Sequence, residues 1–309
     1  MWKYILKRLF YLIPVVAGVI LIVFLIFSVA PGDPARVALG EEATYEALNQ
    51  WREVRGLNDP ILIQYVRYLF GIFTGDFGNS FVRSQSPVFD EIAVKFPYTL
   101  QLAFYSMLIS LVLAFPLGVI AAIKQNTWFD SVSMFIALLG VSMPQFWLGM
   151  LLLLTFALGL GWFPTSGANS WLSIVLPAAS LGFGSMAGMA RTTRSSMLEV
   201  IRQDYIRTAR SKGLSRRKVI IKHAIRNALI PSLTVIGIQM GNLLAGSVIV
   251  ETVFAWPGIG RLMIQSILSN DYPMVLGCLV LYTVCFSLIN LLIDIAYAFV
   301  DPRIKARYS

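Results

Sequence analysis

The sequence predicts an all-α polytopic membrane protein with six transmembrane helices. Of its 309 residues, 57% are hydrophobic and only 13% are charged, whereas a soluble domain carries about a quarter charged residues. Several long tracts of the sequence contain no charged residue. A helix needs about 20 apolar residues to cross a bilayer. These tracts are apolar throughout rather than alternating, which indicates helices and not the strands of a membrane barrel.

The charge-free tracts set the positions of the spans. Four of them are one span long, and the fifth, 131–190, is long enough for two. Its middle, 161–170, combines turn residues with aromatics typical of a membrane interface, so it divides the tract. The first tract has the basic start of a signal peptide, but its apolar run is too long for one. We therefore expect six uncleaved spans, near residues 9–30, 97–123, 131–159, 171–190, 228–250 and 274–299.

The basic residues predict the orientation. If six helices alternate, most of the 25 Lys and Arg residues fall at the two termini, at Lys124 and within 191–226, all on one side of the membrane. The opposite side holds 31–95, in which acidic residues outnumber basic ones. The positive-inside rule then places both termini in the cytoplasm. The net charge of +9 thus reflects topology and contact with lipid, and does not indicate nucleic-acid binding.

Two segments lie outside the spans. The first, 31–95, is predicted to form a small outer cap with helices over 43–55 and 60–73, and both docking of a partner and simple packing over the membrane part remain open as its role. The second, 191–227, is predicted to carry two short amphipathic helices that meet near Gly213, with Ser215 capping the second. Both segments face water at a membrane surface.

Several catalytic motifs are absent from the sequence. It contains no phosphate-binding Gly-x-x-x-x-Gly-Lys loop, no His-Glu-x-x-His zinc motif and no Gly-x-Ser-x-Gly elbow. His223 is the only histidine, and Cys278 and Cys285 lie inside the last predicted span, where packing explains them. We therefore expect no enzyme activity, no cofactor and no metal site in this chain.

One ionisable residue, Asp294, lies inside a predicted span. Asn290 precedes it by one turn, and Tyr297 follows it by nearly one turn, so the three form a polar stripe. Polar residues in a span stabilise helix packing or mark a transport path. Both roles remain open for Asn290, Asp294 and Tyr297.

The cytoplasmic segment carries a family resemblance. Residues 204–214, DYIRTARSKGL, resemble the EAA loop of ABC importer permeases in its dipeptide and oligopeptide variant, although Arg207 and Thr208 stand where the general pattern has Glu and Ala. Further motifs are similar to the B-type permease of dipeptide, oligopeptide, glutathione and nickel importers. These are Arg-Leu at 8–9, Pro-Gly-Asp-Pro at 31–34, GDFGNS at 75–80, ETVFAWPGIG at 251–260, Asp-Tyr-Pro at 271–273 and Asp-Pro-Arg at 301–303.

The resemblance implies a type I ABC importer transmembrane domain. The whole of 1–309 would be one permease subunit of the cytoplasmic (inner) membrane, with a shared core near 94–298 that includes the coupling loop 191–227. Its implied partners are a second, C-type permease, two ATPase subunits and an extracytoplasmic solute-binding protein. Peptides are the expected solute, with glutathione or nickel and other metal chelates as alternatives. A self-contained secondary transporter or channel is the alternative of another class, although no internal repeat of the kind common there is visible.

The resemblance also implies the residues that couple transport to ATP hydrolysis. Ala209 and Gly213 are four residues apart, so they share one face of a helix with Tyr205, and their small side chains would allow a partner to approach closely. The expected coupling residues are Tyr205, Arg207, Thr208, Ala209, Lys212, Gly213 and Leu214.

Overall fold

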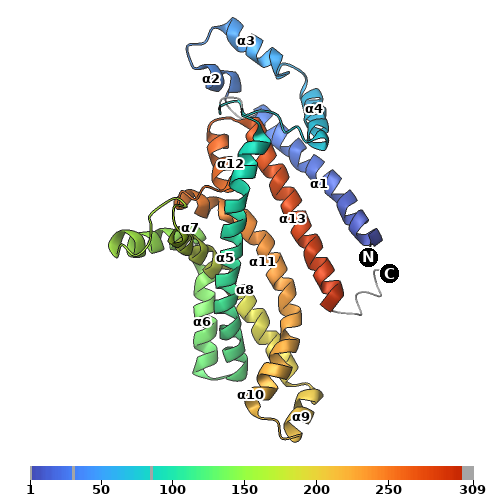
Figure 1. The fold of residues 1–309 in the computed structure, drawn as a ribbon, viewed down its shortest axis with the longest axis vertical. Coiled ribbons are helices and arrows are strands. Elements are labelled where there is room, and N and C mark those ends of the chain that lie inside the picture. Colours follow the sequence, from blue (N-terminus) through green and yellow to red (C-terminus); the bar gives the residue numbers. More distant parts are fainter. Residues whose placement is uncertain (1, 30–31, 84–85, 301–309) are drawn as a thin grey trace. The chain divides into compact units, whose positions relative to one another are not determined.

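The computed structural model describes residues 2–29, 32–83 and 86–300, and in this part of the chain helices dominate. The one pairing of extended residues described there is an isolated antiparallel bridge between Asn79 and Pro87. The described residues form two compact units. The first comprises residues up to 99 together with 257–288, and the second comprises 100–256 together with the residues from 289 on. Figure 1 labels the helices of both units.

Five helices contain apolar windows long enough to cross a membrane. They are α1 (Trp2–Val29), α5 (Val88–Ile123), α8 (Val175–Ile201), α11 (Arg226–Val253) and α13 (Tyr272–Val300). A sixth span is reached if a bent pair of helices is counted as one. The prediction of an all-α protein with apolar spans in these places is confirmed.

The expected third span, 131–159, is broken. It consists of α6 (Trp128–Ser142), α7 (Gln145–Leu152) and a π-helical stretch (Leu153–Gly159), with a bend of 99° after α6. Pro144 explains the break, because proline lacks an N–H and disfavours helical backbone in the residue before it. Met143 is accordingly extended, with φ −99° and ψ 128°. Figure 1 shows α7 turning sideways from the axis of α6.

The segment predicted to form the cap contains α2 (Pro34–Leu39), α3 (Tyr45–Val54) and α4 (Ile61–Thr74), so both helices predicted there are confirmed. Asp33 accepts a hydrogen bond from the N–H of Ala35 at 3.1 Å and caps α2. The same carboxylate binds the guanidinium of Arg52 on α3 at 2.5 Å. The hydrogen bond from Arg52 holds the pKa of Asp33 below its ordinary value of 3.8. The ion pair therefore ties α2 to α3.

A buried carboxylate connects two of the sequence motifs within the first unit. Asp271, which is 1% exposed, precedes α13. It accepts hydrogen bonds from the hydroxyl of Ser80 at 2.5 Å and from the N–H of Phe81 at 2.9 Å. The short helix α12 (Ile259–Leu268) begins nearby in the chain, where the N–H of Ile259 donates to the Thr99 hydroxyl at 2.9 Å. The GDFGNS and Asp-Tyr-Pro motifs are thus joined by a hydrogen-bonded carboxylate.

Small residues allow close helix packing in the second unit, where α8 lies against α6 and α11. A Cβ at Gly118 would lie 2.6 Å from the carbonyl oxygen of Ala190, and one at Gly182 would lie 2.8 Å from that of Ser106. Both contacts are too short for any side chain, so glycine is required where α5 meets α8. The rigid packing of α8 matters for the site described next, because α8 leads directly into it.

Candidate functional site

The candidate site is the short helix α9 (Asp204–Ser211), which follows α8 after a two-residue break. It lies at one end of the second unit beside α10 (Figure 1). Two of its side chains, Ile206 and Ala209, are buried. They pack in an apolar cluster with Met197 of α8 and with Val219 and Ala224. This single apolar stripe seats α9 on the end of the helical bundle.

Gly213 ends α9 in a Schellman motif. The N–H of Gly213 donates to the carbonyl of Arg210 at 2.9 Å, and the N–H of Leu214 donates to that of Ala209 at 3.4 Å. The motif needs a left-handed residue, and Gly213 has φ +78°. Leu214 then packs against the same apolar cluster as Ala209. A Cβ at Gly213 would meet nothing within 4 Å, so the backbone conformation, and not close packing within this chain, explains the glycine.

The remaining face of α9 is exposed and mostly basic. Tyr205 is 44% exposed, and Thr208, Arg210 and Lys212 are also exposed. Arg207 has 76% of its side chain exposed and lies 3.8 Å from Asp204 on the same helix. A helix that uses one stripe to hold itself in place, and presents the rest to water, is available to a partner.

The expected common face of Tyr205, Ala209 and Gly213 is only partly present. Ala209 is 8% exposed and faces the core of its own unit, whereas Tyr205 and Gly213 are exposed. The expectation that Ala209 offers a surface for close approach is therefore wrong, because its small side chain serves packing on α8 and on the helix that follows α9. The exposed coupling candidates are Tyr205, Arg207, Thr208, Lys212 and Gly213.

The second amphipathic helix is not a separate element. α10 (Arg216–Lys218) continues without interruption through a π-helical stretch (Val219–Ile225) into the membrane-spanning α11. Ser215 caps its start, as predicted, by accepting a hydrogen bond from the N–H of Lys218 at 3.4 Å. Only the turn from Lys212 to Ser215 separates α9 from this long helix. A force on α9 would therefore reach a span directly.

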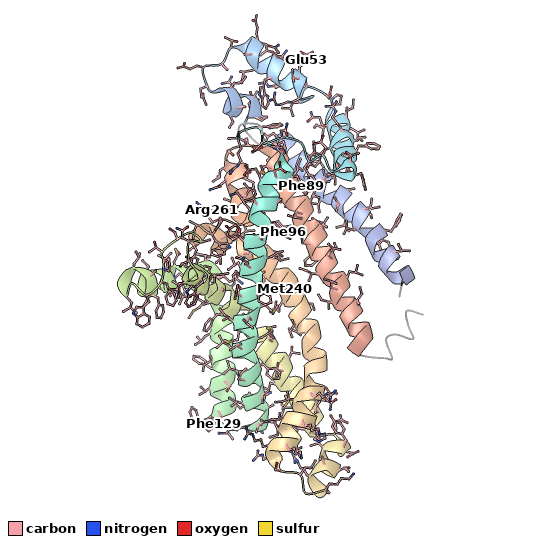
Figure 2. All side chains as sticks on the ribbon, viewed as in Figure 1. Glu53, Phe89, Phe96, Phe129, Met240 and Arg261 are labelled. Carbon is pink, nitrogen blue, oxygen red and sulfur yellow. The ribbon has the colours of Figure 1, made fainter. Side chains whose placement is uncertain are left out.

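An ion pair that no sequence pattern indicated holds this end of the bundle together. Arg194 of α8 donates two hydrogen bonds to the carboxylate of Asp130 on α6, both at 2.7 Å. Asp130 has 9% of its side chain exposed, and it also accepts from the N–H of Asn126 at 3.1 Å. In the same turn the ammonium of Lys124 lies 3.4 Å from the ring centroid of Phe129, which Figure 2 labels. Asp130 and Arg194 are 64 positions apart in the sequence, so their pairing could not be predicted from spacing.

The polar stripe of the last span is only partly visible. Asn290 on α13 is half-buried, and the side chains of Asp294 and Tyr297 lie outside the described residues. The two open roles of this stripe stay predictions. Among the described residues, no three His, Cys, Asp or Glu side chains lie close enough to hold a metal ion.

Comparison with known proteins identifies the family. Residues 114–306 match the family of binding-protein-dependent transport system inner membrane components, and residues 1–103 match the N-terminal domain model of the same transport systems. The chain belongs to this family of ABC importer permeases. It is thus a multi-pass protein of the inner membrane and a transport subunit, and in such systems the ATPase resides on separate subunits. The family resemblance seen in the sequence is confirmed.

Individual proteins of known name or structure are similar to this chain. The chain is 45% identical over 305 residues to the glutathione transport system permease protein GsiC of Salmonella paratyphi A and of Escherichia coli, covering 99% of each protein. Among solved structures, it resembles the MetNI methionine ABC transporter in an inward-facing conformation, with a TM-score of 0.58, 22% identity and coverage of 68% of this chain and 96% of the other. It also resembles an amino acid ABC transporter crystallised with histidines, with a TM-score of 0.54 and 17% identity, covering 68% and 94% of the two chains. These two structures support the fold.

Proposed function

We propose that this permease forms, together with a second permease subunit, the translocation path of an importer for short peptides, including glutathione. Two ATPase subunits drive the path, and a solute-binding protein delivers the solute from outside. The observation that carries this proposal is the exposed helix α9, which is fixed to the bundle by Ile206 and Ala209 and continues into a span after one turn.

The ATPase subunits would bind the exposed face of α9. This face presents one aromatic side chain, Tyr205, among basic side chains such as Arg207 and Lys212. A tyrosine is well suited to anchor an interface, and the basic rim suits an acidic partner surface. Because α9 is joined to α11 through a short turn, movement of the ATPases would be passed to the membrane part.

The solute is proposed from the relatives. GsiC, at 45% identity, is named for glutathione transport. Glutathione is a tripeptide, so the glutathione and peptide alternatives share backbone amide and carboxylate chemistry. The solute named for this relative therefore favours a short peptide over a metal chelate.

Uptake of separately labelled solutes tests the proposal. The complex with its binding protein is reconstituted in vesicles loaded with ATP-regenerating enzymes, and accumulation of labelled glutathione, a labelled dipeptide, a labelled oligopeptide and a labelled nickel chelate is measured for each solute by itself. We expect glutathione or another short peptide to be accumulated only with ATP and the binding protein. Accumulation of the nickel chelate alone would contradict the peptide assignment, and accumulation without ATP would contradict the importer mechanism.

A further inference from the structure

The cap helix α4 packs on a membrane-spanning helix of the same unit. The hydroxyl of Tyr65 donates a hydrogen bond to the carbonyl of Ala17 at 3.1 Å. Ala17 lies near the middle of the apolar window Phe10–Phe27 of α1. The ring of Phe24 lies 6.2 Å from that of Tyr65 and 5.9 Å from that of Tyr68. α4 therefore contacts α1 over residues that a bilayer surrounds, and not only beyond the end of the span.

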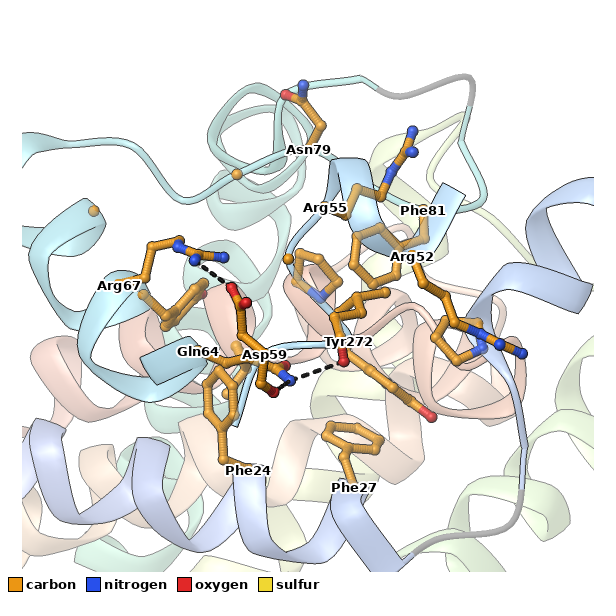
Figure 3. Close-up of a pocket in the computed structure, with 18 of the residues that line it drawn as sticks. Phe24, Phe27, Arg52, Arg55, Asp59, Gln64, Arg67, Asn79, Phe81 and Tyr272 are labelled. Carbon is orange, nitrogen blue, oxygen red and sulfur yellow. Dashed lines mark hydrogen bonds and ion pairs between the residues drawn. The ribbon is translucent and has the colours of Figure 1, made fainter. Parts of the chain in front are cut away.

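A second face of α4 is polar and borders a cavity. Gln64, Arg67 and Gly71 line this cavity, which has a volume of about 780 Å³ and lies within the first unit. Arg67 forms an ion pair with Asp59 at 2.5 Å, and the amide of Gln64 donates to the carbonyls of Leu57 and Asp59 at 3.0 and 2.7 Å. Figure 3 shows these side chains around the cavity, with Phe24 coming from α1. The polar side chains Gln64 and Arg67 on this face therefore have partners within the same unit.

A third face carries large apolar side chains that are exposed. Leu62, Val66, Phe70 and Phe73 are 68%, 41%, 70% and 67% exposed, and at 100° per residue they lie on one side of the helix. This side is separate both from the residues that contact α1 and from those that line the cavity. A contiguous stripe of this kind is unfavourable in water and marks an interaction surface.

We propose that α4 is embedded in the leaflet on the cap's side of the membrane, beside α1, and that lipid acyl chains cover its apolar stripe. Two observations select lipid as the occupant. α4 packs on α1, and the side chains Ile22, Leu25 and Ile26 of that span are themselves 51% to 59% exposed, so both helices of this pair expose large apolar side chains. The polar face of α4, with Arg67, points to a cavity bordered by charged and polar side chains such as Asp59 and Gln64, as expected for a helix lying at the boundary between lipid and water. At 14 residues α4 is too short to span.

Collision accessibility of spin labels tests this placement. Single cysteines replace Val66 or Phe70 on the apolar stripe and, as matched controls one face away, Gln64 or Arg67. The background carries Cys278→Ala and Cys285→Ala, and the assembled importer is studied in lipid nanodiscs. We expect labels at 66 and 70 to collide with oxygen several-fold more than with a water-soluble nickel chelate, and labels at 64 and 67 to show the reverse.

Two results would overturn the proposal. Equal nickel access at all four positions would place α4 in water, and low access to both reagents at 66 and 70 would show that protein covers the stripe. A second measurement keeps the native cysteines. The photoreactive residue p-benzoylphenylalanine in place of Phe70 should give adducts with lipid on irradiation, whereas adducts with another subunit in place of lipid would refute lipid as the occupant.

Discussion

Replacement of Gly213 separates the two reasons why a glycine can be required at a coupling site. The residue has φ +78°, and a Cβ there would meet nothing within 4 Å in this chain. Gly213→Ala should therefore cost about 1 kcal/mol of backbone strain and cause no clash. Gly213→Asn should cost less, because asparagine tolerates the left-handed conformation. Gly213→Trp has the strain of alanine, but adds a large side chain on the surface where the ATPase is proposed to bind.

The assay measures ATP hydrolysis by the purified importer in lipid, with and without loaded binding protein, and the thermal stability of the same complexes. We expect Gly213→Ala and Gly213→Trp to lose similar stability. Stimulated hydrolysis should fall about tenfold in Gly213→Trp, equivalent to about 1.4 kcal/mol of lost coupling, and much less in Gly213→Ala. Lys218→Ala, on the exposed flank after the turn, is the matched control and should remain close to wild type.

Two outcomes would refute this reasoning. Wild-type stimulation in Gly213→Trp would show that α9 is not the coupling element. Equal loss of stimulation in Gly213→Ala and Gly213→Trp would show that backbone strain, and not contact with a partner, sets the requirement for glycine. Ala209→Trp does not make the same distinction, because Ala209 is buried and a larger side chain there should destabilise the fold by about 1 to 3 kcal/mol.

Other perturbations test the rest of the structure. Arg194→Ala should lower the free energy of unfolding by about 1 to 3 kcal/mol, less than for a fully buried pair because the arginine is 28% exposed. A smaller loss in Arg194→Lys would show that the retained positive charge, and not only the paired hydrogen bonds of the guanidinium, contributes. Asp271→Ala removes two hydrogen bonds to a buried carboxylate and should speed amide exchange over 76–83, whereas unchanged exchange would contradict this role. The pKa of Asp33 is lowered in the folded cap, so its stabilising contribution should be constant above pH 3.8 and be lost as the pH falls through the lowered pKa. The fluorine NMR signal of fluorotryptophan-labelled protein should report this change. Loss of the stabilising contribution of Asp33 already near neutral pH would be inconsistent with the lowered pKa. Reporters fused after Ser309 should be cytoplasmic and reporters near Gly40 external, and an external C-terminus would contradict the proposed topology.

The sequence predicted the parts of the fold that depend on local composition. Apolar tracts without charge located the spans, and the turn residues on either side located α3 and α4, because the cost of burying charge in lipid acts on each segment separately. The break in the third span also had a local signal in Pro144, which the length of the apolar tract obscured.

The candidate site was predictable as a segment, but not residue by residue. Gly213 and the capping Ser215 were visible because turn chemistry is local. The direction of Ala209 depended on which side of α9 meets α8 and the start of the next long helix, and the pairing of Asp130 with Arg194 depended on packing between distant helices. Likewise, the sequence predicted a helix over 60–73, while the division of α4 into three faces required the position of α1.

The most direct test of the central claim is the composition of the complex that this chain forms in the membrane. The chain is purified through a C-terminal tag in mild detergent, and the mass of the intact assembly is measured by native mass spectrometry together with its ATPase activity. We expect one copy of this chain with one different permease subunit and two ATPase subunits. A chain that purifies alone or only with copies of itself, and that transports solute without ATP hydrolysis, would show instead a self-contained transporter or channel.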